Sequence, residues 1–265
     1  MPESMRRGVI LLDKPRDLTS MECVERVKDI LKAERAGHSG TLDPSVTGIM
    51  LIALNEARKA MPVLMGLKKE YEGTMHLHGD MDKKRINEVA RDFVGRITQT
   101  PPVRSAVVRK PREREIYFFE ITKIDGKDLY FRVGCESGTY VRKLCHDFGE
   151  KLGRGAHMTG LRRTKINGFS DKECVSIEKL EKEKEKNVIS LEKILERTGL
   201  KKVIVKKESL NKIKNGMPVE KRDIIKMDRL TENEHVGIYF GSDIIALGLV
   251  RDSKKPVIKT DRVFK

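Results

Sequence analysis

The segment 37–48, GHSGTLDPSVTG, constrains the fold more than any other part of the chain. It follows apolar residues at helical spacing in 24–31, and it precedes the apolar run 49–54, which is typical of a buried strand. A glycine-rich loop over 36–48 between a helix and a strand places polar groups at the edge of a sheet. An Asp-Pro step is most often a simple turn, so the pattern alone assigns no chemistry to Asp43.

Strand and helix patterns alternate irregularly through the first part of the chain. Strands are predicted over 8–13 and 70–78, and two more over 116–124 and 129–135 as a hairpin around an Asp-Gly turn. Helices are predicted after a capping box at Thr19, over 86–93 with Gly95 as the C-cap, and over 139–152. This order indicates an α+β domain with a mixed, mainly antiparallel sheet flanked by helices.

The pattern changes near residue 199. The Glu-Lys alternation in 180–187 is typical of a solvated helix or linker. Short strand candidates then follow at 203–205, 236–240, 244–250 and 256–259. We therefore expect a first domain over 1–195 and a small β-rich domain over 196–265.

The balance of charges favours a polyanionic partner. The formal net charge is +15 and the sequence pI is near 9.6, and an excess of this size goes beyond a surface of balanced ion pairs. The apolar runs are too short to cross a bilayer and no signal peptide is visible, so we expect a soluble, cytoplasmic protein that binds no membrane. The four cysteines form no C-x-x-C pair, which argues against zinc or a disulfide framework.

Several polar residues have plain structural interpretations. Lys14 precedes a proline and is expected to be extended and solvated. Tyr71 on a strand is typical of the core, and Arg142 is either a surface charge or a partner for a carboxylate. His76 and His78 share a strand face, but two histidines alone make a poor metal site.

Seven segments nevertheless occur in a specific order: 13–15 (DKP), 36–44 (AGHSGTLDP), 69–71 (KEY), 75–80 (MHLHGD), 101–107 (PPVRSAV), 136–142 (ESGTYVR) and 155–164 (GAHMTGLRRT). In this order the chain resembles the TruB/dyskerin family of pseudouridine synthases, and within it the archaeal H/ACA-type enzyme. The resemblance implies the pseudouridine synthase fold and the conversion of uridine to pseudouridine in RNA.

The resemblance also implies catalytic roles. Asp43 matches the family nucleophile, Arg142 the cation that keeps this aspartate ionised, and Tyr71 the residue that stacks on the target base and assists proton transfer. The reaction breaks the glycosidic bond, turns the uracil and rejoins it through carbon, which a carboxylate can assist covalently. A hydrolytic glycosidase would require a second carboxylate beside Asp43, and the matched segments supply Arg142 and Tyr71 instead, which favours the isomerase.

Further residues are placed in an RNA- and base-binding set. His38 matches a residue that contacts RNA near the flipped nucleotide, and Leu161 matches an apolar residue of the base pocket. Lys14 lies in the Lys-Pro element and is expected to support the site, and Tyr140 belongs to the motif that holds Arg142. The resemblance implies no metal and no organic cofactor, and the target base must be flipped out of folded RNA.

The substrate class stays open at this level. The chain from about residue 200 resembles a short PUA domain, and residues 78–82 run directly into a helix where stand-alone TruB enzymes carry an insertion. The missing insertion favours modification of rRNA with an H/ACA guide RNA and the small H/ACA ribonucleoprotein proteins as partners. The short C-terminal domain favours the TΨC-loop uridine of tRNA. The alternative from another class is a non-catalytic RNA-binding or ribosome-assembly scaffold.

Overall fold

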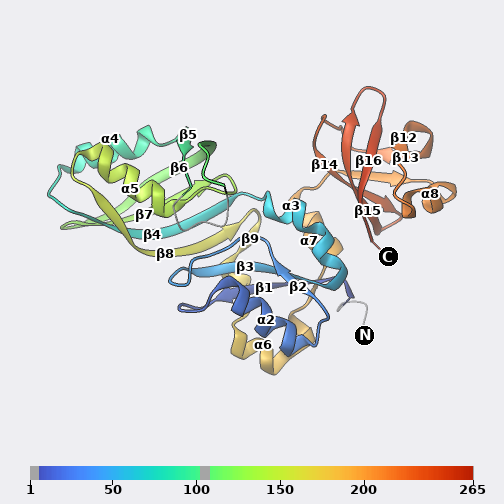
Figure 1. Ribbon diagram of the computed structural model, residues 1–265, viewed down its shortest axis with the longest axis horizontal. Coiled ribbons are helices and arrows are strands. Elements are labelled where there is room, and N and C mark those ends of the chain that lie inside the picture. Colours follow the sequence, from blue (N-terminus) through green and yellow to red (C-terminus); the bar gives the residue numbers. More distant parts are fainter. Residues whose placement is uncertain (1–5, 102–107, 265) are drawn as a thin grey trace.

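The structure, a computed structural model, describes residues 6–101 and 108–264. Its larger sheet has the strand order β10-β1-β3-β8-β4-β7-β6-β5, with β2 paired to β3 and β9 paired to β8 (Figure 1). The strands are β1 Gly8–Lys14, β2 Ala36–His38, β3 Thr47–Leu54, β4 Lys69–Leu77, β5 Gly95–Gln99, β6 Arg112–Asp125, β7 Asp128–Cys135, β8 Ala156–Ile166, β9 Phe169–Ser170 and β10 Ile189–Ser190. Among the described strands of this sheet, the pair β3–β8 is parallel and the others are antiparallel.

Helices flank this sheet in separate groups (Figure 1). The helices are α2 Ser20–Leu31, α3 Met61–Met65, α4 Lys83–Asp92, α5 Val141–Leu152, α6 Ile177–Glu183 and α7 Leu191–Thr198. Short 3-10 turns are η1 Asn55–Ala60, η2 Asp171–Glu173 and η3 Lys184–Asn187. The apolar faces of α4 and α5 pack on β4, β6 and β7, whereas α2 and α6 pack on β1 and β3. The expected α+β class, a mainly antiparallel sheet flanked by helices, is confirmed.

Local signals explain several element boundaries. The capping box at Thr19 is confirmed, because its side chain accepts from the N–H of Glu22 and the Glu22 carboxylate accepts from the N–H of Thr19. The helix predicted over 86–93 is α4, and it begins directly after Asp82, whose carboxylate caps it. The direct run from 78–82 into a helix is therefore confirmed.

Two local predictions are wrong. Gly95 is not the C-cap of α4, since that position is Phe93, and Gly95 instead opens β5 with φ of 99°. A helix C-cap and the first residue of a strand can both have a positive φ, so a glycine by itself does not distinguish one from the other. The loop expected over 36–48 also contains the short strand β2, because Ala36–His38 pairs with β3.

A second sheet begins at Lys202. It comprises β11 Lys202–Val205, β12 Val219–Glu220, β13 Ile224–Met227, β14 His235–Phe240, β15 Asp243–Asp252 and β16 Val257–Val263, in the order β12-β16-β15-β14-β11-β13. Its remaining elements are η4 Lys207–Ser209, α8 Leu210–Lys214 and η5 Lys221–Asp223. The edge strands β12 and β13 are joined by the three-residue η5, so the sheet curls toward a small barrel. The domain division at residue 195 stays a prediction.

The two sheets share one apolar cluster. Residues of α7, among them Leu191 and Ile194, pack between β1 and β3 on one side and Tyr239, Leu247 and Phe264 on the other. The second sheet also has its own buried core, centred on valines and isoleucines of β11, β14 and β16. Within the described residues, no helix is long and apolar enough to cross a membrane.

Candidate active site

Asp43 lies in the turn between β2 and β3, and this turn is fixed from both sides. The backbone N–H of Val46 donates to the carbonyl of Asp43 at 3.0 Å. The hydroxyl of Ser20, in the first turn of α2, donates to the Leu42 carbonyl at 3.0 Å and accepts from the Leu42 N–H at 2.9 Å. Leu42 is buried, whereas the Asp43 side chain is 42% exposed. The turn therefore presents one carboxylate to solvent on a rigid base.

Lys14 holds the same turn through hydrogen bonds from its side-chain ammonium. Its ammonium donates to the carbonyls of Pro15 at 2.9 Å, Pro44 at 3.0 Å and Val46 at 2.9 Å. The side chain is fully buried, so the expectation of a solvated lysine was wrong. Burial lowers the pKa of Lys14, and the Asp43 carboxylate is among the neighbours that oppose this shift.

Arg142 forms an ion pair with Asp43. Its Nη2 lies 2.7 Å from Oδ2 of Asp43, and the Arg142 side chain is 48% exposed. The start of α5 is fixed by Gln99 of β5, which accepts from the Tyr140 N–H at 3.0 Å and donates to the Tyr140 carbonyl at 3.2 Å. An ion pair this exposed adds little to the free energy of unfolding, so we interpret its position as serving function rather than stability.

Tyr71 and Leu161 lie on the neighbouring strands β4 and β8. Tyr71 is 9% exposed, and burial raises the pKa of its phenol, while the Arg163 charge and a hydrogen bond from Arg163 oppose the rise. A Cβ on Gly73 would lie 2.9 Å from Cδ1 of Leu161, so this glycine makes room for the leucine side chain. The two strands thus place an aromatic ring and an aliphatic side chain on adjacent positions of the sheet.

His38 is the last residue of β2, five residues before Asp43. Its Nδ1 accepts from the N–H of Gly40 at 3.3 Å. Burial and, secondly, the Arg163 charge lower the pKa of His38, so the neutral imidazole is favoured. Five candidate residues therefore lie around the turn between β2 and β3, through direct contacts or through the charges of Arg163 and Asp43. They are Lys14, His38, Asp43, Tyr71 and Arg142.

Sequence reasoning assigned no role to Arg163, Lys69, Ser20 or Gln99. Arg163 and Lys69 lie within the matched segments, but only the strand register shows that they are buried beside the turn. Lys69 is 5% exposed and donates to the carbonyls of Met65 at 2.7 Å and Leu67 at 2.6 Å. What distinguishes Arg163 and Lys69 is that they are cations buried beside the Asp43 turn, and a local sequence pattern does not show burial.

No group of three or more histidine, cysteine or acidic side chains suited to a metal ion occurs among residues 6–101 and 108–264. His76 instead pairs with Asp128 at 2.7 Å, and Nε2 of His78 lies 2.9 Å from Nδ1 of His157. The four cysteines are free, and burial raises the pKa of Cys135 to about 12.

The burial of Lys69 predicts a pH dependence of stability. The pKa of Lys69 is lowered from 10.5 to about 8, with burial as the main cause. Between these values the unfolded chain binds a proton that the folded protein has lost, so stability rises with pH in this window. The buried thiols of Cys135, Cys145 and Cys174 act in the opposite sense as the pH approaches their ordinary pKa of 9.0. The contribution of Lys69 is therefore measured between pH 8 and 9 as the difference between the wild type and a variant without this lysine.

Relative to Lys69→Met, we expect the wild type to gain about 1 kcal/mol in free energy of unfolding from pH 8 to pH 9. Urea unfolding of both proteins at both pH values measures this difference. The thiols contribute equally to the two proteins, so equal changes with pH in the wild type and in Lys69→Met would contradict the assignment to Lys69.

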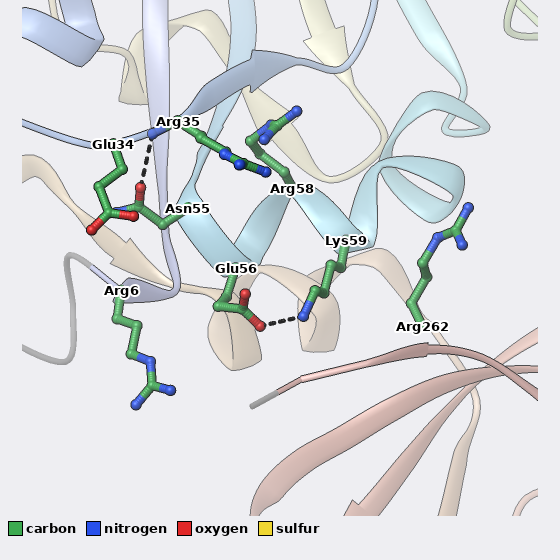
Figure 2. Close-up of a pocket in the computed structure, with 8 residues that line it drawn as sticks. All are labelled: Arg6, Glu34, Arg35, Asn55, Glu56, Arg58, Lys59 and Arg262. Atoms are coloured by element: carbon green, nitrogen blue, oxygen red, sulfur yellow. Dashed lines mark hydrogen bonds and ion pairs between the residues drawn. The ribbon is translucent and has the colours of Figure 1, made fainter. Parts of the chain in front are cut away.

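A basic cleft lies at the opposite end of β3 from Asp43 (Figure 2). Its volume is about 690 Å³, and it is lined by Arg6, Glu34, Arg35, Asn55, Glu56, Arg58, Lys59 and Arg262. Glu56 pairs with Lys59, and the Asn55 side chain accepts from the Arg35 backbone. The guanidinium groups of Arg35 and Arg58 make no ion pair with any residue that the structure describes. Arg262 comes from β16, so both sheets contribute to the cleft.

Comparisons with known proteins give family matches over most of the chain. The family described as "TruB family pseudouridylate synthase (N terminal domain)" matches residues 28–84 and 78–141, and "tRNA pseudouridylate synthase B C-terminal domain" matches residues 142–210. The "Probable tRNA pseudouridine synthase B" of Methanopyrus kandleri is 39% identical over 274 residues, covering 98% of this chain and 80% of the relative. The protein of the same name from Methanocaldococcus jannaschii is 40% identical over 272 residues, covering 97% and 80%.

Solved structures match over the whole chain. "Crystal Structure of a Cbf5-Nop10-Gar1 Complex" contains a chain with a TM-score of 0.91 and 36% identity, covering 100% of this chain and 88% of that one. "Structure of H/ACA RNP bound to a substrate RNA containing 2'-deoxyuridine" contains one with a TM-score of 0.87 and 33% identity, with the same coverage.

The fold and the relatives define an RNA-modifying isomerase. The chain belongs to the TruB family of pseudouridine synthases, as the resemblance implied. Its activity is the isomerisation of uridine to pseudouridine in RNA.

Proposed function

We propose that Asp43 is the nucleophile of this isomerisation. The observation that carries the proposal is the 2.7 Å pair between the half-exposed carboxylate of Asp43 and Arg142, on a turn that buried Lys14 holds by its carbonyls. The guanidinium orients the carboxylate, and the exposed edge of the carboxylate is open to a nucleotide. A carboxylate held in this way can form a covalent intermediate with the ribose or the base.

The neighbouring residues form the base-binding part of the site. The ring of Tyr71 stacks on the flipped uracil, and its phenol, which burial keeps protonated, assists proton transfer. Leu161 forms an apolar wall, and His38 contacts RNA beside the flipped nucleotide as a neutral imidazole. Tyr140 contributes from the N-terminus of α5, where Gln99 fixes its backbone. The site needs no metal or cofactor for this chemistry.

The basic cleft supports binding of the RNA backbone at a distance from the target base. A strand rises about 3.3 Å per residue, so the eight-residue β3 separates the cleft from the Asp43 turn by roughly 25 Å. Guanidinium groups without carboxylate partners are suited to phosphates. The second sheet, in this proposal a PUA-like RNA-binding domain over 196–265, lines the cleft through Arg262.

The substrates in this proposal are rRNA, addressed through an H/ACA guide RNA, and the TΨC-loop uridine of tRNA. Two solved relatives support the H/ACA part of this proposal, one in a Cbf5-Nop10-Gar1 complex and one in an H/ACA RNP bound to a substrate RNA. By this likeness, small H/ACA ribonucleoprotein proteins are partners of the chain. The curated relatives are named for tRNA. We place the enzyme in the cytoplasm.

The test has two formats. In the first, the purified protein is incubated alone with unmodified tRNA. In the second, it is incubated with rRNA fragments, a guide RNA and the partner proteins. Pseudouridine is counted for the wild type and for Asp43→Ala. Product on tRNA alone that vanishes in the variant indicates a stand-alone enzyme, and product only with guide and partners indicates the H/ACA machine. Absence of Asp43-dependent product in both formats would leave the RNA-binding scaffold as the function.

The cleft predicts a loss of RNA affinity without loss of chemistry. In Arg35→Ala/Arg58→Ala, two exposed cations are removed roughly 25 Å from the Asp43 turn. We expect weaker RNA binding at every salt concentration, and a slope of log K against log salt that is shallower by about 2. The single-turnover rate at saturating RNA should stay unchanged.

The matched control is Lys123→Ala/Lys127→Ala in the hairpin between β6 and β7, which removes the same charge outside the cleft. Equal losses of affinity in both double variants would mean that net charge alone, and not the cleft, sets RNA binding.

A further inference from the structure

Arg163 occupies the strand position that joins the two halves of the candidate site. On β8 it pairs with Gly48 of β3 on one side and with Tyr71 of β4 on the other. Its side chain is 1% exposed, and no carboxylate among residues 6–101 and 108–264 lies within ion-pair distance of it. The preceding residue of β8, Arg162, lies on the other face of the sheet and pairs with Asp13 and Asp171.

The guanidinium of Arg163 binds both ends of the segment that carries Asp43. Its Nε donates to the Ile49 carbonyl at 2.7 Å, and its Nη2 donates to the Gly40 carbonyl at 3.2 Å. Gly40 precedes Asp43 by three residues and Ile49 follows it by six, so one side chain spans the turn. The same guanidinium reaches the phenol of Tyr71.

A buried cation without an anionic partner is costly, and replacement by an apolar side chain of similar size is often neutral or stabilising. Here the cost is increased, because Lys14 and Lys69 are buried around the same turn. The Arg163 charge lowers the pKa of Lys14, of His38 and of Lys69, after the larger effect of burial. A side chain retained only for packing would not need this charge.

We propose that Arg163 is a positioning residue for the isomerisation, which holds the Asp43 turn and the Tyr71 phenol in one fixed geometry. The proposal rests on the proposed function of Asp43. Arg163 does not contact the nucleotide and acts through the Gly40 and Ile49 carbonyls and through Tyr71. Its planar fork donates to the Gly40 and Ile49 carbonyls at once and lies opposite Tyr71 in the sheet, an arrangement that a lysine cannot reproduce.

The test compares Arg163→Met with Arg163→Lys. For Arg163→Met we expect the single-turnover rate to fall about 100-fold while the Kd for RNA stays within about threefold, since misplaced reactive groups cost rate rather than RNA contacts. For Arg163→Lys, which keeps the charge but not the fork, we expect a loss of about tenfold.

A second readout separates a charge in the site from a purely structural role. The pKa of His38, followed by NMR of ¹³C-labelled histidine and assigned with His38→Gln, should rise in Arg163→Met and stay near the wild-type value in Arg163→Lys. The charged and titratable groups around this histidine and turn include Lys14, Asp43, Arg58, Lys69, Tyr71, Arg142 and Arg163. The matched control, Arg162→Met, removes the neighbouring guanidinium and should lower the melting temperature without moving the His38 titration.

A folded Arg163→Met with wild-type rate and an unmoved His38 titration would overturn the proposal. If Arg163→Met fails to fold, Arg163→Lys decides, since a wild-type rate there would show that the fork is not required. Failure of the proposed function is distinct, because it would appear as wild-type product formation by Asp43→Asn whatever the Arg163 variants do.

Discussion

Replacing Asp43 with asparagine is expected to reduce pseudouridine formation by about 10⁴-fold or more, while the affinity for RNA changes by less than about threefold. The amide keeps the size of the side chain but has no anionic oxygen with which to attack. The turn should survive the change, because Lys14 and Ser20 hold backbone groups and not the Asp43 side chain. Single-turnover assays and RNA titrations measure the two quantities separately.

The matched control is Asp125→Asn in the β6–β7 hairpin, where an exposed carboxylate pairs with Lys123. This variant loses the same charge and one surface ion pair, which is worth little, so we expect wild-type turnover. If Asp43→Asn lost RNA affinity and turnover in equal proportion, the carboxylate would be an RNA-binding group rather than the nucleophile.

Gly48→Ala is expected to have the largest effect on stability, a loss of about 4 kcal/mol in the free energy of unfolding. Gly48 is the second residue of β3 and has a φ of 106°, and a Cβ there would lie 2.2 Å from the carbonyl oxygen of Arg163. This oxygen belongs to the backbone of the paired strand β8, so it cannot move away as a side chain would. The parallel pair β3–β8 would have to separate beside Asp43.

Gly199→Ala is the matched control for this prediction. Gly199 also has a positive φ, 75°, but nothing lies within 4 Å of a Cβ built there. Only the backbone strain remains, at about 1 kcal/mol. Urea unfolding of both variants gives the comparison, and a loss in Gly48→Ala no larger than in Gly199→Ala would mean that β3 and β8 are less closely paired than the structure has them.

Much of the fold could be predicted from local signals. The capping box of Thr19, the Asp-Gly turn of the β6–β7 hairpin and the apolar run of β3 are each contained within a few residues, and each was confirmed. Gly95 was misassigned because a positive φ serves a helix end and a strand start equally. Strand order could not be predicted, because pairs such as β3–β8 join residues more than one hundred positions apart.

The site could be predicted only in part. The residue pattern predicted an ordinary turn at Asp43 and a solvated side chain for Lys14. The family resemblance supplied the roles of Asp43, Tyr71 and Arg142. The structure adds the 2.7 Å contact between Asp43 and Arg142 and the burial of Lys14. Arg163 escaped notice because its importance depends on lying between β3 and β4, which only the register of the sheet shows.

The most direct test of the account follows the hydrogen at C5 of the target uridine. Joining C5 of uracil to the ribose displaces this hydrogen, so RNA labelled with tritium at C5 releases tritium to water when pseudouridine forms. The assay uses the wild type, Asp43→Asn and Asp125→Asn, on tRNA and on guide-directed rRNA substrates. The account predicts release by the wild type and by Asp125→Asn on at least one substrate, and none by Asp43→Asn. Release by Asp43→Asn at the wild-type rate would contradict it.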